Sequence, residues 1–163
     1  MTDTLEAVAR TVAIGAGATL TMDLWAAMLR RFGIPSLDFA LLGRWIGHLP
    51  EGRIIHASIG KAAPVRGERA LGWIAHYSIG ISFAALLLAI FGLRWAHAPT
   101  LGPAMLIGLV TVVAPLFVLQ PALGAGVASS KTARPVFNTV KSIVTHTVFG
   151  LGLYTSALLA ASM

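Results

Sequence analysis

Four long stretches with little or no charge constrain this 163-residue chain more than any other feature. They lie between successive charged residues and contain 19, 24, 36 and 22 residues, at 11–29 (interrupted by Asp23), 70–93, 95–130 and 142–163. A helix needs about 20 mainly apolar residues to cross about 30 Å of hydrocarbon, where its backbone satisfies its own hydrogen bonds. The sequence therefore predicts an all-α, polytopic transmembrane four-helix bundle. It forms one integral membrane domain, 1–163, with spans at about 8–30, 70–93, 100–123 and 140–161.

Composition supports the same class and removes several kinds of site. Hydrophobic residues make up 56% of the chain and charged residues 11%, whereas about a quarter of the residues in soluble domains are charged. The chain has no cysteine, which excludes disulfides, thiolate metal ligands and cysteine nucleophiles. The lipid bilayer is therefore the first partner that the sequence predicts.

The placement of the basic residues predicts an orientation. Ten of the twelve lie on one side of the four-span arrangement: Arg30, Arg31, Arg44, Arg53, Lys61, Arg66, Arg69, Lys131, Arg134 and Lys141. Cytoplasmic connections carry such an excess of Lys and Arg. We therefore expect a bacterial cytoplasmic membrane protein with the connections 31–69 and 124–139 in the cytoplasm and both termini in the periplasm. The membrane topology then explains the net charge of +6, and we expect no nucleic acid partner.

The start of the chain does not have the character of a cleaved signal peptide. The leader MTDTLEAVAR carries two acidic residues and one basic residue, where a signal peptide carries a positively charged segment. We therefore expect the first span to remain in the protein as a membrane helix.

The first connection contains a predicted amphipathic helix at about 36–49. Ser36 precedes it as an N-cap, Asp38 lies in its first turn, and apolar residues recur at helical spacing. We expect this additional helix to lie at the inner leaflet, with Arg44 and His48 near the lipid headgroups.

Further expectations concern side chains near the membrane boundaries. The stretch 50–66 is rich in Gly, Pro and Ala, and we expect a surface loop with one turn of helix. Loop histidines are commonly exposed, so His48 and His56 are expected to be solvated. Tryptophans gather at membrane interfaces, and we expect this position for Trp25, Trp73 and Trp95.

Three spans each carry one ionisable residue on a face of small residues. Residues four apart drift only about 40° around a helix. The groups that share a face are Gly15, Thr19 and Asp23; Gly72, His76 and Gly80; and Ser142, His146, Gly150 and Tyr154. Small residues allow close helix packing, which directs Asp23, His76 and His146 into the bundle.

These three ionisable residues are expected at a similar depth. Each lies five to seven residues from the nearest boundary Arg or Lys, about 8–10 Å deep at 1.5 Å per residue. Tyr154 is expected to pack in the bundle or to gate its outer side.

The third span differs because it contains two prolines. Pro115 and Pro121 each remove a backbone donor, so we expect the cytoplasmic half of this span to be kinked or broken. Gln120 lies between them, and broken helices occur at membrane depth where protein or a wet cavity surrounds them. The predicted buried polar site is Asp23, His76, Gln120 and His146, with Glu68 and Arg69 at its cytoplasmic mouth.

Five segments in this order carry a resemblance to a known family. They are GAGATLTMDLW, GRWIGH, GERALGWIAHYSIGISFA, TVVAPLFVLQPALGAGVASS and SIVTHTVFGLGLY. In these segments the chain resembles DUF2938, a bacterial family of small inner-membrane proteins of unknown function. The resemblance implies a four-span membrane protein and brings no activity, cofactor or ligand with it.

The leading functional hypothesis is a small transport or proton/cation-relay module. Burial disfavours the charged forms of carboxylic acids and imidazoles, so Asp23 would exchange a proton or accompany a cation, with His76 as its partner. Four helices are few for alternating access, and the hypothesis therefore predicts a homo-oligomer or a membrane partner.

Three alternatives remain open at this point. His76 and His146, with Asp23 as a third ligand, would suit a divalent metal, and the two histidines alone would suit a haem. A structural or accessory subunit would use the same polar residues as hydrogen bonds between helices. A membrane hydrolase is the weakest alternative, because Ser and Thr in membrane helices commonly bond their own preceding turn, as Ser78, Ser82, Ser142 and Thr145 would.

Overall fold

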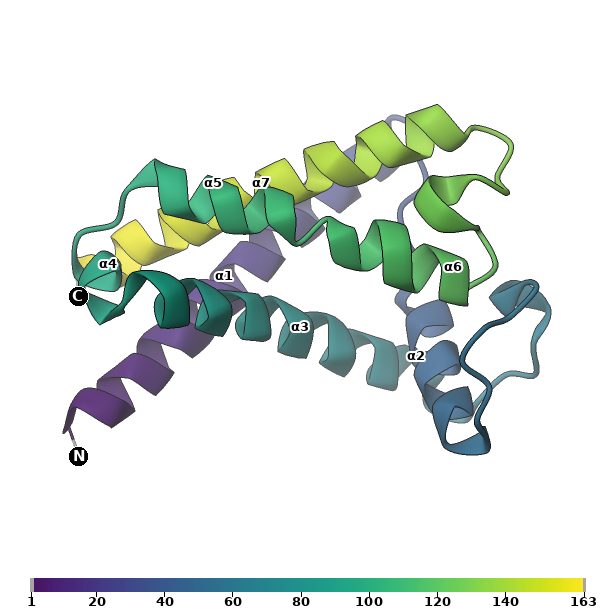
Figure 1. The fold of residues 1–163 in the computed structure, drawn as a ribbon, viewed down its shortest axis with the longest axis horizontal. Coiled ribbons are helices and arrows are strands. Elements are labelled where there is room, and N and C mark those ends of the chain that lie inside the picture. Colours follow the sequence, from purple (N-terminus) through teal and green to yellow (C-terminus); the bar gives the residue numbers. More distant parts are fainter. Residues whose placement is uncertain (1, 163) are drawn as a thin grey trace. The chain divides into compact units, whose positions relative to one another are not determined.

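The computed structural model describes residues 2–162, and these residues form an all-α structure (Figure 1). Four helices are long and apolar enough to cross a membrane, at Thr4–Arg31, Glu68–Phe91, Leu101–Ala122 and Pro135–Ala161. The four predicted spans are therefore confirmed, and the chain is a multi-pass membrane protein by helix length and hydropathy. The α-helices are α1 (Thr2–Arg31), α2 (Phe39–His48), α3 (Glu68–Phe91), α4 (Leu93–His97), α5 (Leu101–Val110), α6 (Gln120–Ala122) and α7 (Pro135–Ala161).

The chain divides into two compact units. The bundle unit consists of the described residues of 1–34, 77–111 and 145–163, and the loop unit of 35–76 and 112–144. Helices α3 and α7 contribute their first turns to the loop unit and their remaining turns to the bundle unit.

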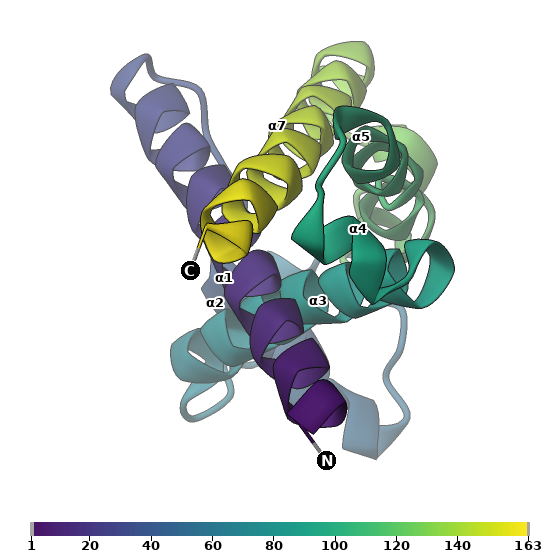
Figure 2. The ribbon, with the colours of Figure 1, turned by 90° about the vertical axis from the view of Figure 1, so that its left-hand side faces the viewer.

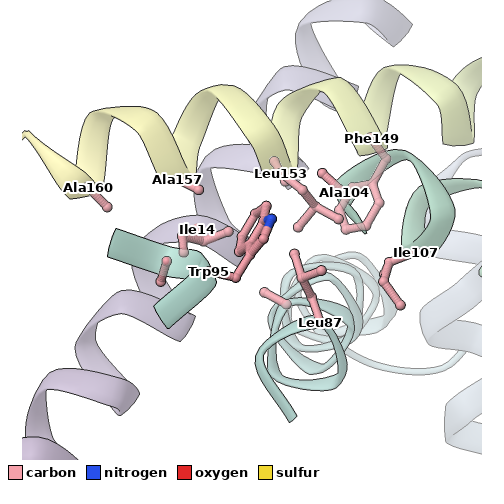
Figure 3. Packing of buried hydrophobic residues seen from close by; sticks show 12 residues of the cluster. Ile14, Leu87, Trp95, Ala104, Ile107, Phe149, Leu153, Ala157 and Ala160 are labelled. Carbon is pink, nitrogen blue, oxygen red and sulfur yellow. The ribbon is translucent and has the colours of Figure 1, made fainter. Parts of the chain in front are cut away.

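The core of the bundle unit is a cluster of twelve buried apolar residues from α1, α3, α4, α5 and α7. Figure 3 shows the Trp95 ring among Ile14, Leu87 and Leu153, which come from α1, α3 and α7. The short helix α4 follows Gly92, whose φ of 77° is a left-handed conformation that favours glycine.

Trp95 packs in this core with only 6% of its side chain exposed, and its expected interfacial level stays a prediction. Its indole N–H donates to the carbonyl of Thr100 at 3.2 Å, which satisfies the one polar group of the ring. Tyr154 is half-buried and packs against the same cluster, as expected.

Helices of the bundle unit approach one another at small residues. Helices α5 and α7 lie side by side (Figure 2). A Cβ on Gly108 of α5 would meet the backbone of α7 at Gly150 and His146. Helix α1 meets α7 in the same way, with Gly152 against the backbone of Ala18. The predicted packing by small residues is confirmed at these contacts.

The third span is broken where the two prolines predict it. Helix α5 ends at Val110, and a π-helical segment follows at Ala114–Leu119. The N–H of Gln120 bonds the carbonyl of Pro115, five residues earlier, which is the wider turn that defines a π-helix. The passage from the bundle unit to the loop unit lies at this break, between residues 111 and 112.

The loop unit begins with the additional helix, α2. Its N-cap is Asp38, whose carboxylate accepts from the N–H of Ala40 at 2.9 Å, so the expected N-cap at Ser36 is wrong by two residues. Helix α2 crosses the start of α3 at Gly43 and Gly72, where a Cβ on either glycine would collide with the other helix's backbone.

The connection between α2 and α3 folds against the end of the third span. It contains two short 3-10 turns, at Leu49–Glu51 and Ile59–Lys61, where one turn was expected. The N–H groups of His56 and Ile59 donate to the carbonyls of Ala122 and Leu123 at 2.9 and 3.1 Å. The loop is therefore held in place by backbone hydrogen bonds.

Candidate functional site

Asp23 lies half-buried on α1, and its carboxylate accepts a hydrogen bond from another membrane-length helix. The phenol Oη of Tyr77, on α3, donates to Asp23 Oδ2 at 3.1 Å. Both residues belong to the bundle unit, and Tyr77 is also half-buried. The sequence analysis missed Tyr77, although its place three residues before Gly80 puts it on the same face of α3.

The contact between α1 and α3 that supports this pair is built from small residues. A Cβ on Gly80 would collide with the Thr19 hydroxyl oxygen, and a Cβ on Gly15 would meet the backbone of Ile81. The Thr19 hydroxyl donates to the carbonyl of Gly15 at 2.7 Å, so its polar group is satisfied within α1. Small side chains thus bring the two backbones close enough for Tyr77 to reach the carboxylate.

The two predicted site histidines belong to different units. His146 is 8% exposed in the bundle unit, where its backbone carbonyl lies against Gly108. His76 belongs to the loop unit, and its ring stacks on Phe39 of α2 with centroids 4.1 Å apart and an angle of 26°. Trp73 lies edge-on to the same imidazole at 5.9 Å. The roles assigned to these histidines stay predictions.

Gln120 is the centre of a polar network in the loop unit. Its side-chain carbonyl accepts from the Ser129 hydroxyl at 3.0 Å, and its amide N–H donates to Ser142 Oγ at 3.2 Å. Ser129 is buried and has a positive φ of 61°, as does Ala128 with 48°. The network thus links the broken third span, an uncommon left-handed turn and the start of α7.

Glu68, one of the two residues predicted at the mouth, forms a two-pronged ion pair with Arg44 of α2. Arg44 Nε and Nη2 lie 2.8 and 2.7 Å from the two carboxylate oxygens. The exposed fractions of the two side chains are 13% and 17%. The N–H of Val65 also donates to this carboxylate at 2.9 Å. The hydrogen bond from Arg44 to Glu68 raises the pKa of the Arg44 guanidinium above its ordinary value.

The Arg44 side chain is turned into the loop unit by this pairing, and its expected headgroup position stays a prediction. Its remaining Nη1 points at carbonyl groups of the loop and donates to Ala62 O at 3.2 Å. Arg69, the other residue predicted at the mouth, is exposed. Sequence spacing gave no signal for the pairing of Arg44 with Glu68, because the two residues lie 24 positions apart.

The expected solvation of His48 is wrong. Its side chain is 3% exposed, and Nε2 lies 2.9 Å from the carbonyl of Ala63, so Nε2 is the nitrogen that donates. The His56 ring is half-buried and meets His48 edge-to-face with centroids 5.2 Å apart. Both rings are covered because the loop folds back over α2.

The metal and hydrolase hypotheses of the sequence analysis receive no support from the geometry of the described residues. Among residues 2–162, no three His, Asp or Glu side chains lie close enough together to hold a metal ion. The haem hypothesis stays a prediction. The hydroxyls of Ser82 and Ser142 donate to the carbonyls of Ser78 and Asn138, four residues earlier, as expected of helical serines without a catalytic role.

Comparison with known proteins identifies a family and no function. Residues 12–160 match the family DUF2938, described as a protein of unknown function. No curated protein and no solved structure matches the chain.

Proposed function

The chain belongs to the DUF2938 family, and since that family has no assigned activity, we propose from its own residues that it is a proton- or cation-relay module of the membrane. Asp23 is the group that takes up and releases the proton, and Tyr77 is the hydrogen-bond donor that holds it. This role is the transport function expected from the sequence, with Tyr77 added to the site.

The observation that carries the proposal is the hydrogen bond of 3.1 Å between Tyr77 Oη and Asp23 Oδ2. An ionised carboxylate at the centre of a membrane helix costs about 2.5–3.5 kcal/mol by insertion scales, and such residues mark ion pathways and proton relays. A hydroxyl donor offsets part of that cost in the charged state. When Asp23 takes up a proton it loses its charge. The protonated and ionised forms therefore differ in the free energy of burying the side chain in the membrane.

The break in the third span supports the same role. Discontinuous helices supply backbone groups at membrane depth in many transporters, and here α5 gives way to the π-helical segment Ala114–Leu119. Four helices are few for alternating access. We therefore propose that the module works with a second copy of the chain or with a membrane partner.

The proposed orientation follows from charge. The loop unit contains eight basic and three acidic residues, a net charge of +5 with neutral histidines. Connections rich in Lys and Arg stay in the cytoplasm, which places the loop unit on the cytoplasmic side of a bacterial inner membrane. Both termini then lie in the periplasm.

Proton flux into liposomes tests the proposal. The purified protein is reconstituted with a pH-sensitive dye inside the vesicles, and flux is driven by a potassium diffusion potential. Asp23→Asn is expected to reduce flux to that of protein-free vesicles. Tyr77→Phe is expected to reduce it roughly tenfold, since a hydrogen bond to a charged group contributes about 1.5–3 kcal/mol.

Matched controls come from the same chain. Tyr154→Phe alters the other tyrosine of the bundle unit, and Glu51→Gln removes an exposed carboxylate of the loop unit. Both variants should retain full flux. Undiminished flux in Asp23→Asn would refute the proton role.

A structural or accessory subunit is the second candidate function. The observation that favours it is the Gln120 network, whose hydrogen bonds to Ser129 and Ser142 join the end of the third span to the following turn and to the start of α7. Under this alternative the wild-type protein would carry no flux, and Gln120→Leu would reduce stability alone.

A further inference from the structure

Two consecutive isoleucines at the tip of the α2–α3 connection are exposed. Ile54 is 60% exposed and Ile55 is 76% exposed. They stand in a stretch, 50–66, that otherwise consists mainly of small, polar and charged residues. Neighbouring exposed apolar side chains on a polar segment mark a surface that contacts a partner or a membrane.

The backbone holds this tip in one place. The indole N–H of Trp45 donates to the carbonyl of Ile54 at 2.8 Å, which ties the tip to α2. On the other side the N–H of His56 donates to Ala122 O at 2.9 Å. A Cβ on Gly124, whose φ is 94°, would collide with the backbone of Ala57. The isoleucines therefore project from a fixed backbone.

The same contacts attach the tip to the end of a candidate membrane span. Ala122 is the last residue of the third membrane-length helix, and His56 is bonded directly to it. Ile55 is the next residue along the chain, with its Cα about 3.8 Å from that of His56. The two isoleucines thus lie next to the end of a candidate membrane span.

The charges around the tip determine which lipid it fits. Arg53 precedes the isoleucines with 62% of its side chain exposed, and Lys61 and Arg66 are exposed in the same connection. Glu51 is the one acidic residue in this stretch, 3.4 Å from Arg53. Exposed Lys and Arg next to a membrane attract anionic headgroups, and a guanidinium binds a phosphate through two parallel N–H donors.

We propose that Arg53, Ile54 and Ile55 form a docking tip for anionic phospholipid. The isoleucines insert between the headgroups of the leaflet at the end of the third span, and Arg53 binds a lipid phosphate beside them. This inference is independent of proton relay, because it involves none of the residues of the Asp23–Tyr77 pair.

Spin labelling measures the depth of the tip directly. The chain has no cysteine, so Ile55→Cys carries a single nitroxide, and Ala63→Cys labels an exposed position of the same connection as the matched control. In vesicles that contain phosphatidylglycerol, the label at 55 should be accessible to oxygen and shielded from a water-soluble nickel chelate. The label at 63 should show the opposite preference. Equal access of the nickel chelate to both positions would overturn the proposal.

The charge requirement has its own comparison. In the labelled Ile55→Cys protein, the additional substitution Arg53→Gln should reduce the preference of the label for the lipid phase of anionic vesicles about fivefold. This is the effect of one basic residue near such a surface. The same substitution should leave the immersion of the label in pure phosphatidylcholine vesicles unchanged. The label at 55 could instead be shielded from both oxygen and the nickel chelate, and this shielding could disappear on dilution into excess lipid. That result would identify a second copy of the chain as the occupant and refute lipid docking. Ile54→Cys provides a second label if Ile55→Cys fails to fold.

Discussion

The bundle unit and the loop unit of this protein are stabilised in different ways. The bundle unit has four basic and three acidic residues, and its core is the twelve-residue apolar cluster. The loop unit has eight basic and three acidic residues and few large buried apolar side chains, namely Leu42, Ile59 and Leu116. Its segments are joined instead by the Arg44–Glu68 ion pair and the Gln120 network.

The difference follows from the solvent that each part has to exclude. Lipid tails are as apolar as leucine, so membrane helices associate through close packing, which small residues allow. Near water, charged and polar side chains can be ordered into networks because the alternative partner is solvent. In the bundle unit Glu6 is paired with Arg10 and His97. The Asp23 carboxylate instead accepts from the Tyr77 phenol within a membrane-length helix, which is why we propose it as the functional group.

The largest effect is expected where backbones touch in the bundle unit. Gly108→Leu places a side chain against the backbone of α7 at Gly150, where no side chain can move aside. We expect a loss of roughly 3 kcal/mol or more in the free energy of unfolding. Gly102→Leu on the same helix is the control, because no atom lies within 4 Å of a Cβ there. Thermal unfolding in detergent, followed by circular dichroism, should give Gly108→Leu a much lower melting temperature than Gly102→Leu. Equal melting temperatures would contradict the packing described.

An intermediate effect is expected in the loop unit. Arg44→Met leaves the Glu68 carboxylate without its two-pronged partner and should lower the melting temperature clearly. Arg53→Met breaks the exposed pair with Glu51 and should change it little. Combining Arg44→Met with Glu68→Leu should restore most of the loss. A double variant as unstable as the single one would show that lost packing, and not an unpaired carboxylate, causes the effect.

The smallest effect concerns the left-handed turn next to Gln120. Ala128 has a φ of 48°, which disfavours a side chain. Ala128→Gly should raise stability by about 0.5 kcal/mol, since the relief of backbone strain exceeds the added freedom of the unfolded chain. Ala133→Gly, outside the left-handed region, should lower stability slightly. Thermal unfolding in detergent measures both variants. Destabilisation by Ala128→Gly would mean that this turn is not strained.

Sequence reasoning found the spans because hydrophobic length is a local property. It misplaced some ends: the fourth span was predicted to begin near residue 140, whereas α7 begins at Pro135. Lys141 lies inside the helix, and its ammonium group donates to the carbonyl of Pro35 at 2.6 Å. Proline positions predicted the break in the third span because a missing donor is equally local.

The site was only partly predictable, because side-chain partners are set by tertiary contacts. The helix face of Asp23 could be inferred from spacing, and the structure places Tyr77 against it. Arg44 and His48 were expected at the surface because they lie on a short amphipathic helix. They are covered by a loop whose path depends on hydrogen bonds to Ala122 and Leu123, which no local pattern signals.

Infrared difference spectroscopy on the protein in lipid, between acidic and alkaline pH, tests the central claim most directly. The claim predicts a carbonyl stretch from a protonated carboxylic acid that is present at acidic pH and lost at alkaline pH. This band should shift in Tyr77→Phe, persist in Tyr154→Phe and vanish in Asp23→Asn. A band that survives unchanged in Asp23→Asn, or a wild-type spectrum in which no such band responds to pH, would contradict the assignment of Asp23 as the proton carrier.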